Sequence, residues 1–145
     1  MLKRNVVATF LGSLLAAAPL PGSMVSMAAG VEKAPPAVAV TQLMTQDLIG
    51  GPDKEVIMLT VTYPAAGASL PHRHDAQVFV YVLEGELIMQ VRGAPAVTLR
   101  PGQTFYEARD DVHVVSANSS KTAPAKMLVV MIKDKGKPGT RAVAD

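Results

Sequence analysis

The sequence predicts an all-β domain that closes into a single barrel, and three features of the chain indicate this. Short apolar runs alternate with Gly, Pro and Asp, which is typical of strands joined by tight turns. The runs are rich in β-branched residues, which favour strands, and after the N-terminal segment no region shows the helical period of about 3.6 residues. Several runs are apolar on both faces, whereas an open antiparallel sheet normally has one polar face. One face should therefore line the barrel interior, and the other should be covered by a second sheet, the N-terminal strand or another subunit of a homodimer.

Turn residues divide the domain into its expected elements. A Gly/Pro/Asp turn at 50–53 separates the first two strands, and the region 64–71 reads as a loop. Glu84 and Gly85 form a tight turn because glycine accepts a positive φ, and the turns at 93–95 and 100–102 follow the same logic. The expected strands are 38–48, 55–63, 77–83, 87–92, 97–99, 103–107, 112–117 and 127–133.

The N-terminus resembles a secretory leader. Lys3 and Arg4 precede an apolar run at 6–18, which is too short for a transmembrane helix of roughly 20 residues. The small residues at 26–28 place cleavage after Ala28; cleavage at 16–18, before a proline, and an uncleaved membrane anchor are the alternatives. The chain has no cysteine, which excludes a lipoprotein anchor and disulfides. The expected location is periplasmic or secreted.

One small domain remains after the leader is removed. The chain has 14 basic and 12 acidic residues, and loss of Lys3 and Arg4 leaves a formally neutral protein. Together with the absence of tryptophan, this argues against a nucleic-acid partner, and no membrane contact is expected after cleavage. The predicted organisation is a signal peptide at 1–28, a flexible linker at 29–39, the barrel at 40–134 and a mobile C-terminal tail at 135–145.

The chain has only three histidines, and their spacing points to a metal site. Residues two apart in a strand face the same side, so His72 and His74 should project together. His113 lies in a later strand that a barrel can return to the same point. Three neutral imidazoles suit Zn, Cu, Fe or Ni. The alternative is a metal-free or degenerate pocket.

Two motifs resemble those of the cupin superfamily. The first runs from Gly67 to His74 and continues at 81–85 as Tyr-Val-Leu-Glu-Gly; the second is Gly-Gln-Thr-Phe-Tyr-Glu at 102–107, followed by His113 and Asn118. The similarity covers roughly 55–133. It implies a small single-domain β-barrel, or jelly roll, in which two histidines, a glutamate and a third histidine hold a metal.

The sequence departs from the cupin pattern where the glutamate is expected. That position, four residues after the second histidine, is Val78. The adjacent Gln77 is a candidate fourth metal ligand, provided that the turn at 75–76 shifts the strand register, because strict alternation would point its side chain away. Ala108 and Asp110 replace the usual proline and glycine before the last histidine.

Glu107 is the candidate catalytic residue. It is an acid beside the apolar stretch Phe105-Tyr106 and close before the turn that leads to His113. It could ligate the metal in place of the missing glutamate, or act as a general base with a raised pKa. The alternative is a rim carboxylate paired with Arg109 or Arg92.

These features predict a periplasmic, metal-dependent enzyme of dioxygenase type that acts on a small molecule. Fe(II) is the expected metal, by analogy with three-histidine cupin dioxygenases, with Zn, Cu, Ni or Mn as alternatives. The second hypothesis is a non-catalytic module that binds a small ligand or a metal at a degenerate site. An enzyme should have an open pocket with the imidazole nitrogens within about 4 Å of one another. A binding module should have a histidine turned outward or an apolar plug such as Val78 or Phe79.

Overall fold

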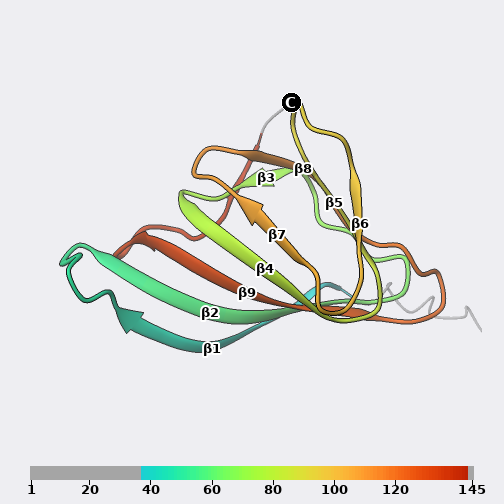
Figure 1. The fold of residues 1–145 in the computed structure, drawn as a ribbon, viewed down its shortest axis with the longest axis horizontal. Helices are drawn as coiled ribbons and strands as arrows, with labels where there is room; N and C mark the ends of the chain where they lie inside the picture. Colours follow the sequence, from blue (N-terminus) through green and yellow to red (C-terminus); the bar gives the residue numbers. More distant parts are fainter. Residues whose placement is uncertain (1–36, 144–145) are drawn as a thin grey trace, which may run out of the picture. The chain divides into compact units, whose positions relative to one another are not determined.

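The computed structural model describes residues 37–143, and it has the predicted all-β fold (Figure 1). Two five-stranded antiparallel sheets make up this region. In the first sheet the order is β1 (Ala39–Asp47), β2 (Lys54–Tyr63), β9 (Ala125–Asp134), β4 (Ala76–Glu84) and β7 (Thr104–Glu107). In the second it is β10 (Arg141–Ala142), β3 (His72–Arg73), β8 (Val112–Asn118), β5 (Leu87–Val91) and β6 (Val97–Leu99). Between residues 37 and 143, no helix is long and apolar enough to cross a membrane.

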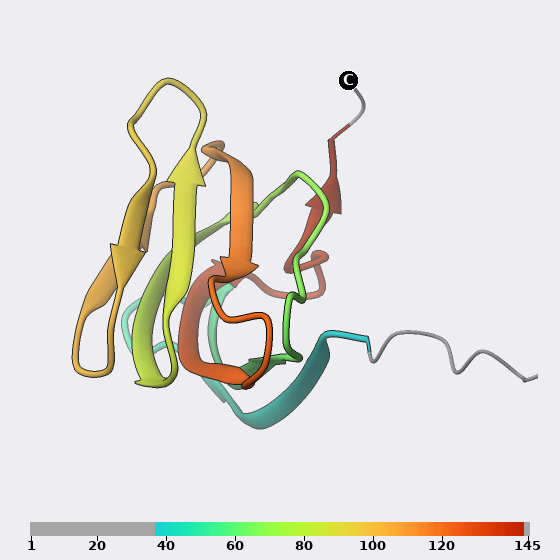
Figure 2. The same ribbon diagram turned by 90° about the vertical axis from the view of Figure 1, so that its right-hand side faces the viewer.

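The eight expected strands lie within two residues of the observed bounds, and the sequence missed two short ones. Both β3 and β10 are two residues long, too short for an alternating pattern to reveal them. They pair with each other, with Ala142 opposite His72, and Figure 2 shows the C-terminal strand in dark red beside the green segment that carries β3. The segment predicted as a mobile tail therefore contributes a strand. The predicted signal peptide and most of the predicted linker lie outside the described residues.

The core lies between the two sheets and follows from strict alternation along the strands. In β4, Val78, Val80 and Val82 are buried, while the intervening side chains are exposed. Inward residues of β9, namely Met127, Val129 and Met131, lie beside them in register. These residues belong to the same buried cluster as Leu87 and Met89 of the second sheet. A second sheet is thus the cover for the inner faces.

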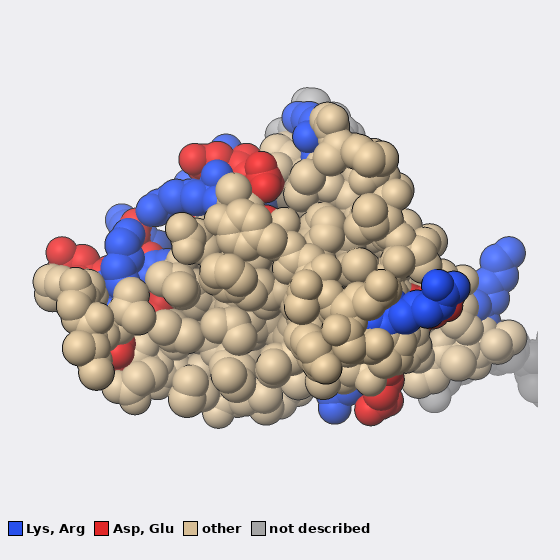
Figure 3. Space-filling model, viewed as in Figure 1, with Lys and Arg blue, Asp and Glu red and all other residues tan. Residues whose placement is uncertain are grey.

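The outer face of the first sheet remains apolar and exposed. Phe79, Tyr81 and Tyr106 are each more than 40% exposed, and the rings of Phe79 and Tyr106 lie 5.3 Å apart. Figure 3 shows charged side chains around the edges of this view, with an uncharged middle over β2, β9, β4 and β7. The homodimer predicted from strands that are apolar on both faces would cover this surface, and it stays a prediction.

The turn before β8 tolerates the replaced motif residues. Asp110 has a φ of +77°, the region in which glycine is the easiest residue to place. Aspartate is one of the few other residues that visit this region, because its short polar side chain bonds locally. The neighbouring Asp111 accepts a hydrogen bond from the amide of Ala108 at 2.8 Å, which closes the turn. Loss of the motif proline and glycine therefore leaves the path to His113 intact.

Asn118 fixes the loop that leads to the first histidines. Its Nδ2 donates to the carbonyl oxygens of Pro64 and Ala123, at 2.9 and 2.7 Å, and its backbone amide donates to Gly67 O. Because the side chain is buried, its amide needs these partners. The motif asparagine thus has a structural role: it holds the loop 64–71 against the end of β8.

Candidate metal centre

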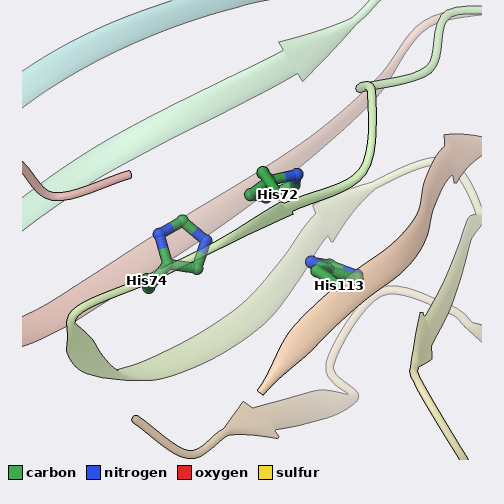
Figure 4. A group of neighbouring side chains, drawn as sticks. All are labelled: His72, His74 and His113. Atoms are coloured by element: carbon green, nitrogen blue, oxygen red, sulfur yellow. The ribbon is translucent and has the colours of Figure 1, made fainter. Parts of the chain in front are cut away.

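Strand pairing brings the three histidines together. His72 on β3 lies directly opposite His113 on β8, and directly opposite residues project from the same face of a sheet. His74 follows two residues after His72. One nitrogen from each ring can be chosen so that all three lie within 4.8 Å of one another, a little wider than the expected separation (Figure 4). The imidazoles converge, and none is turned outward.

Backbone carbonyls set the orientation of His72 and His74. His72 Nδ1 lies 2.8 Å from Leu70 O, and His74 Nδ1 lies 2.8 Å from Gly139 O. Since a carbonyl can only accept, each Nδ1 carries the proton and each Nε2 keeps a free lone pair. Metal-binding histidines are usually held by such a bond from the other ring nitrogen. Burial lowers the pKa of His72 against the opposing effect of the Leu70 hydrogen bond, which favours the neutral imidazole that a metal needs.

Glu107 and His113 form the deepest part of the site and lack hydrogen-bond partners. Each is only 2% exposed. Glu107 Oε2 lies 3.1 Å from His113 Nδ1 and 3.8 Å from His74 Nε2. Despite this proximity the geometry is not that of a hydrogen bond, so Glu107 Oε2 and both nitrogens of His113 have no partner within the described region. Buried polar atoms without partners are costly, and a cation bound here would satisfy Glu107 Oε2 and one of the two nitrogens of His113. The residues therefore fit a divalent metal.

Gln77 is not brought to the histidines, which corrects its prediction as a fourth ligand. Ala76 and Val78 on either side of it are buried, so alternation points the Gln77 side chain to the outer face of β4. There it lines a separate hollow with Lys54 and Arg109. The turn at 75–76 does not shift the register, because pairing with β9 runs unbroken from Ala76 to Val82.

The alternative of a rim carboxylate for Glu107 also fails. Arg109 pairs with Asp134 at 2.7 Å rather than with Glu107. Within residues 37–143, the ion-pair partners of Glu107 are His74 and His113 alone. The predicted catalytic residue therefore lies beside two of the three histidines.

The cluster opens onto a cavity of about 340 Å³ between the sheets. Half of the lining residues are valine, leucine or methionine, and none of the described ones is a lysine or arginine. Val78 lines the cavity without plugging it. Tyr63 Oη contacts Ser116 Oγ at 2.6 Å and Ser69 Oγ at 2.9 Å, which adds a hydroxyl network to the wall. Sequence reasoning missed these hydroxyls, because only the pairing of distant strands brings them together.

The C-terminal segment completes the site. Besides the carbonyl of Gly139, the hydroxyl of Thr140 lies 3.1 Å from His74 Nδ1, and both Thr140 and Ala142 line the cavity. Arg141 pairs with Asp75 at 2.5 Å, next to His74 in sequence. This segment therefore holds His74 in place, a role that its Gly- and Lys-rich composition does not reveal.

Ending the chain after Pro138 should weaken metal binding about 10–100-fold, the usual loss when the partner that orients a metal-binding histidine is removed. The cause is loss of the Gly139 carbonyl and of the β10–β3 pairing. Competition with a coloured chelator measures the affinity. A chain ending at Val143 retains both contacts and should bind like the full chain. Equal affinity of the two truncated chains would contradict this role.

Comparison with known protein families shows the family of this chain. The family model of the cupin domain matches residues 59–131, half of the chain. The chain belongs to the cupin family. Its matched region extends from β2 to β9 and contains all three histidines and Glu107. Among curated proteins, no sequence matches this cupin.

Solved structures similar to this cupin include enzymes and a protein described only by its fold. The DMSP lyase DddQ from Ruegeria pomeroyi DSS-3 is 22% identical, with a TM-score of 0.59 over 74% of this chain and 52% of the lyase. An oxalate oxidase in complex with the substrate analogue glycolate is 27% identical, with a TM-score of 0.58 over 77% of this chain and 57% of the oxidase. A cupin-like protein from Thermotoga maritima is 18% identical, with a TM-score of 0.58 over 74% of this chain and 77% of that one. This cupin thus spans about half the length of the two enzymes.

Proposed function

We propose that this cupin is a metal-dependent enzyme that acts on a small molecule. The observation that carries the proposal is the convergence of His72, His74 and His113 at the wall of a cavity, with the unpartnered carboxylate of Glu107 beside His74 and His113. A closed structural site would leave no room for a substrate, whereas this one adjoins about 340 Å³, at the lower end of the usual range for small-molecule pockets.

Fe(II) is the proposed metal and dioxygenase chemistry the proposed reaction type. Imidazole-rich sites with open positions suit iron, although Zn, Cu, Ni and Mn also take such ligands. Once bound, a divalent ion would supply Lewis-acid polarisation of a substrate oxygen, and iron would add one-electron chemistry with O₂. An oxalate oxidase among the similar structures, and a DMSP lyase whose likeness is in fold, support a reaction on a small organic molecule.

The chain's own residues supply binding, exclusion of water and orientation. The apolar walls from β2, β4 and β9 keep water from the reacting centre, which strengthens electrostatic interactions there. Tyr63, Ser69 and Ser116 form a set of hydroxyls that offers a substrate hydrogen bonds away from the imidazoles. Leu70 O and Gly139 O hold the protons of His72 and His74 on Nδ1.

The proposal includes export to the periplasm and a homodimer. Export is supported by the basic start at Lys3 and Arg4, the apolar run at 6–18 and the absence of cysteine. The homodimer is supported by the exposed aromatic side chains Phe79, Tyr81 and Tyr106 on one uncharged face, since aromatic residues are enriched at subunit interfaces.

Metal content tests the proposal directly. The mature protein, purified without a histidine tag or added metal, should contain near-stoichiometric iron, or another first-row transition metal, by inductively coupled plasma mass spectrometry. Oxygen consumption in the presence of candidate small molecules then tests the reaction type. Purified protein that contains no metal and binds none on titration would contradict the enzyme proposal. It would favour a non-catalytic module that binds apolar ligands in the cavity.

A further inference from the structure

The position of the missing motif glutamate and the position of Glu107 face each other across a strand pair. Val78 on β4 is directly opposite Glu107 on β7. Opposite residues in an antiparallel pair have Cβ atoms about 4.5–5.5 Å apart and project from the same face. Both side chains are buried on the inner face and line the cavity. A carboxylate at either position therefore reaches the same volume beside the histidines.

The distances from Glu107 to two of the histidines match those between two ligands of one ion. Two atoms bound to one ion at about 2.0–2.2 Å in a tetrahedral arrangement lie about 3.4 Å apart. The observed separations of Glu107 Oε2 from His113 Nδ1 and His74 Nε2, at 3.1 and 3.8 Å, bracket that value. The same oxygen has no hydrogen bond in the described part of the chain. No lysine or arginine in that part pairs with Glu107, whose partners there are the imidazoles of His74 and His113. With those imidazoles neutral, a bound cation would compensate the charge of the buried carboxylate.

We propose that Glu107 is the carboxylate ligand of the metal, supplied from β7 across the strand pair in place of a glutamate at Val78. This inference rests on the proposed function, because it assumes that the three histidines hold an ion. It makes the protein's contribution three neutral imidazoles and one negative charge. It also assigns Glu107 to holding the ion, not to serving as a free base. Val78 then belongs to the apolar wall of the cavity, and the side chains that β4 contributes to that wall are uncharged.

Substitution of Glu107 tests the ligand role through metal binding, independently of any activity. Co(II) is the probe, because its visible absorption spectrum responds to the number and type of its ligands. Glu107→Gln should lower Co(II) affinity by about 100-fold or more, beyond the loss typical of a residue that only orients a ligand, and should change the spectrum of the bound ion. A carboxylate that only orients His113 would leave that spectrum unchanged.

A swap across the strand pair makes the test specific. Glu107→Val should lose affinity, and the double variant Val78→Glu with Glu107→Val should restore it to within about tenfold of the original, since the carboxylate returns to the same volume. The control is Val80→Glu with Glu107→Val, which places the carboxylate on the same face about 7 Å farther along β4. It should not restore binding. Thermal unfolding of each variant verifies that it is folded.

The outcomes separate this inference from the function on which it rests. An unsubstituted protein that binds no Co(II) would overturn the proposed metal function. An unsubstituted protein that binds Co(II), with unchanged affinity and spectrum in Glu107→Gln, would overturn only the role of Glu107. A folded Val78→Glu swap that does not restore binding would overturn the equivalence of the two positions.

Discussion

Replacing His113 with alanine should abolish metal retention. His113 is buried on β8, directly opposite His72, and its ring nitrogens have no other partner in the described region. His72, His74 and the proposed ligand Glu107 would remain, so the site would lose one of its four proposed ligands and one of its three imidazoles. We expect the affinity to fall by at least about 100-fold, so that the purified variant contains no stoichiometric metal by mass spectrometry.

Gln77→Ala is the matched control for His113→Ala. Gln77 also belongs to a strand that lines the cavity and was itself a candidate ligand, but its side chain lies on the outer face of β4. Its removal should leave metal content unchanged. Retention of metal by His113→Ala, or loss of metal from Gln77→Ala, would mean that the ion is held elsewhere.

Replacing Gly85 with alanine should destabilise the domain by about 2–5 kcal/mol, enough to unfold a marginally stable protein. Gly85 has a φ of +71°, a conformation that costs other residues about 1–2 kcal/mol. A Cβ there would also lie 2.8 Å from Pro124 O and 2.9 Å from Ala125 Cα, which are backbone atoms that cannot move aside. Such overpacking costs typically about 1–3 kcal/mol more. Urea unfolding followed by circular dichroism measures the change.

Gly93→Ala separates the two contributions. Gly93 has a φ of +85°, but nothing lies within 4 Å of its added Cβ. This variant should lose only the conformational share, about 1–2 kcal/mol. Equal losses for Gly85→Ala and Gly93→Ala would show that the contact with the Pro124–Ala125 backbone is unimportant.

Local patterns were sufficient to predict the fold class. The alternation of Val78, Val80 and Val82 with exposed residues, and the turn at Gly85, depend on periodicity and on backbone sterics that neighbouring residues already specify. The spacing of His72 and His74 likewise predicts a shared face. These are the features in which the sequence and the structure agree, and the match of the cupin domain to residues 59–131 agrees with them.

The fourth ligand shows where local reasoning stopped. The strand pattern around Gln77 allowed either register, and the sequence offered Gln77 and Glu107 as alternatives. Pairing of β4 with β9 and β7 decides between them: it points Gln77 outward and sets Glu107 opposite Val78. Register is a property of two strands together, so one strand alone cannot specify it.

The sequence by itself determined that this chain forms a β domain with two histidines two residues apart and a third histidine on a later strand. Only the tertiary structure decided that His113 lies opposite His72, that Glu107 joins them, and that Gly139 and Thr140 return to hold His74. The physical reason is the range of the interactions. Strand propensity and turns act over a few residues, whereas the site is assembled by strand pairing between residues as far apart as His72 and Ala142.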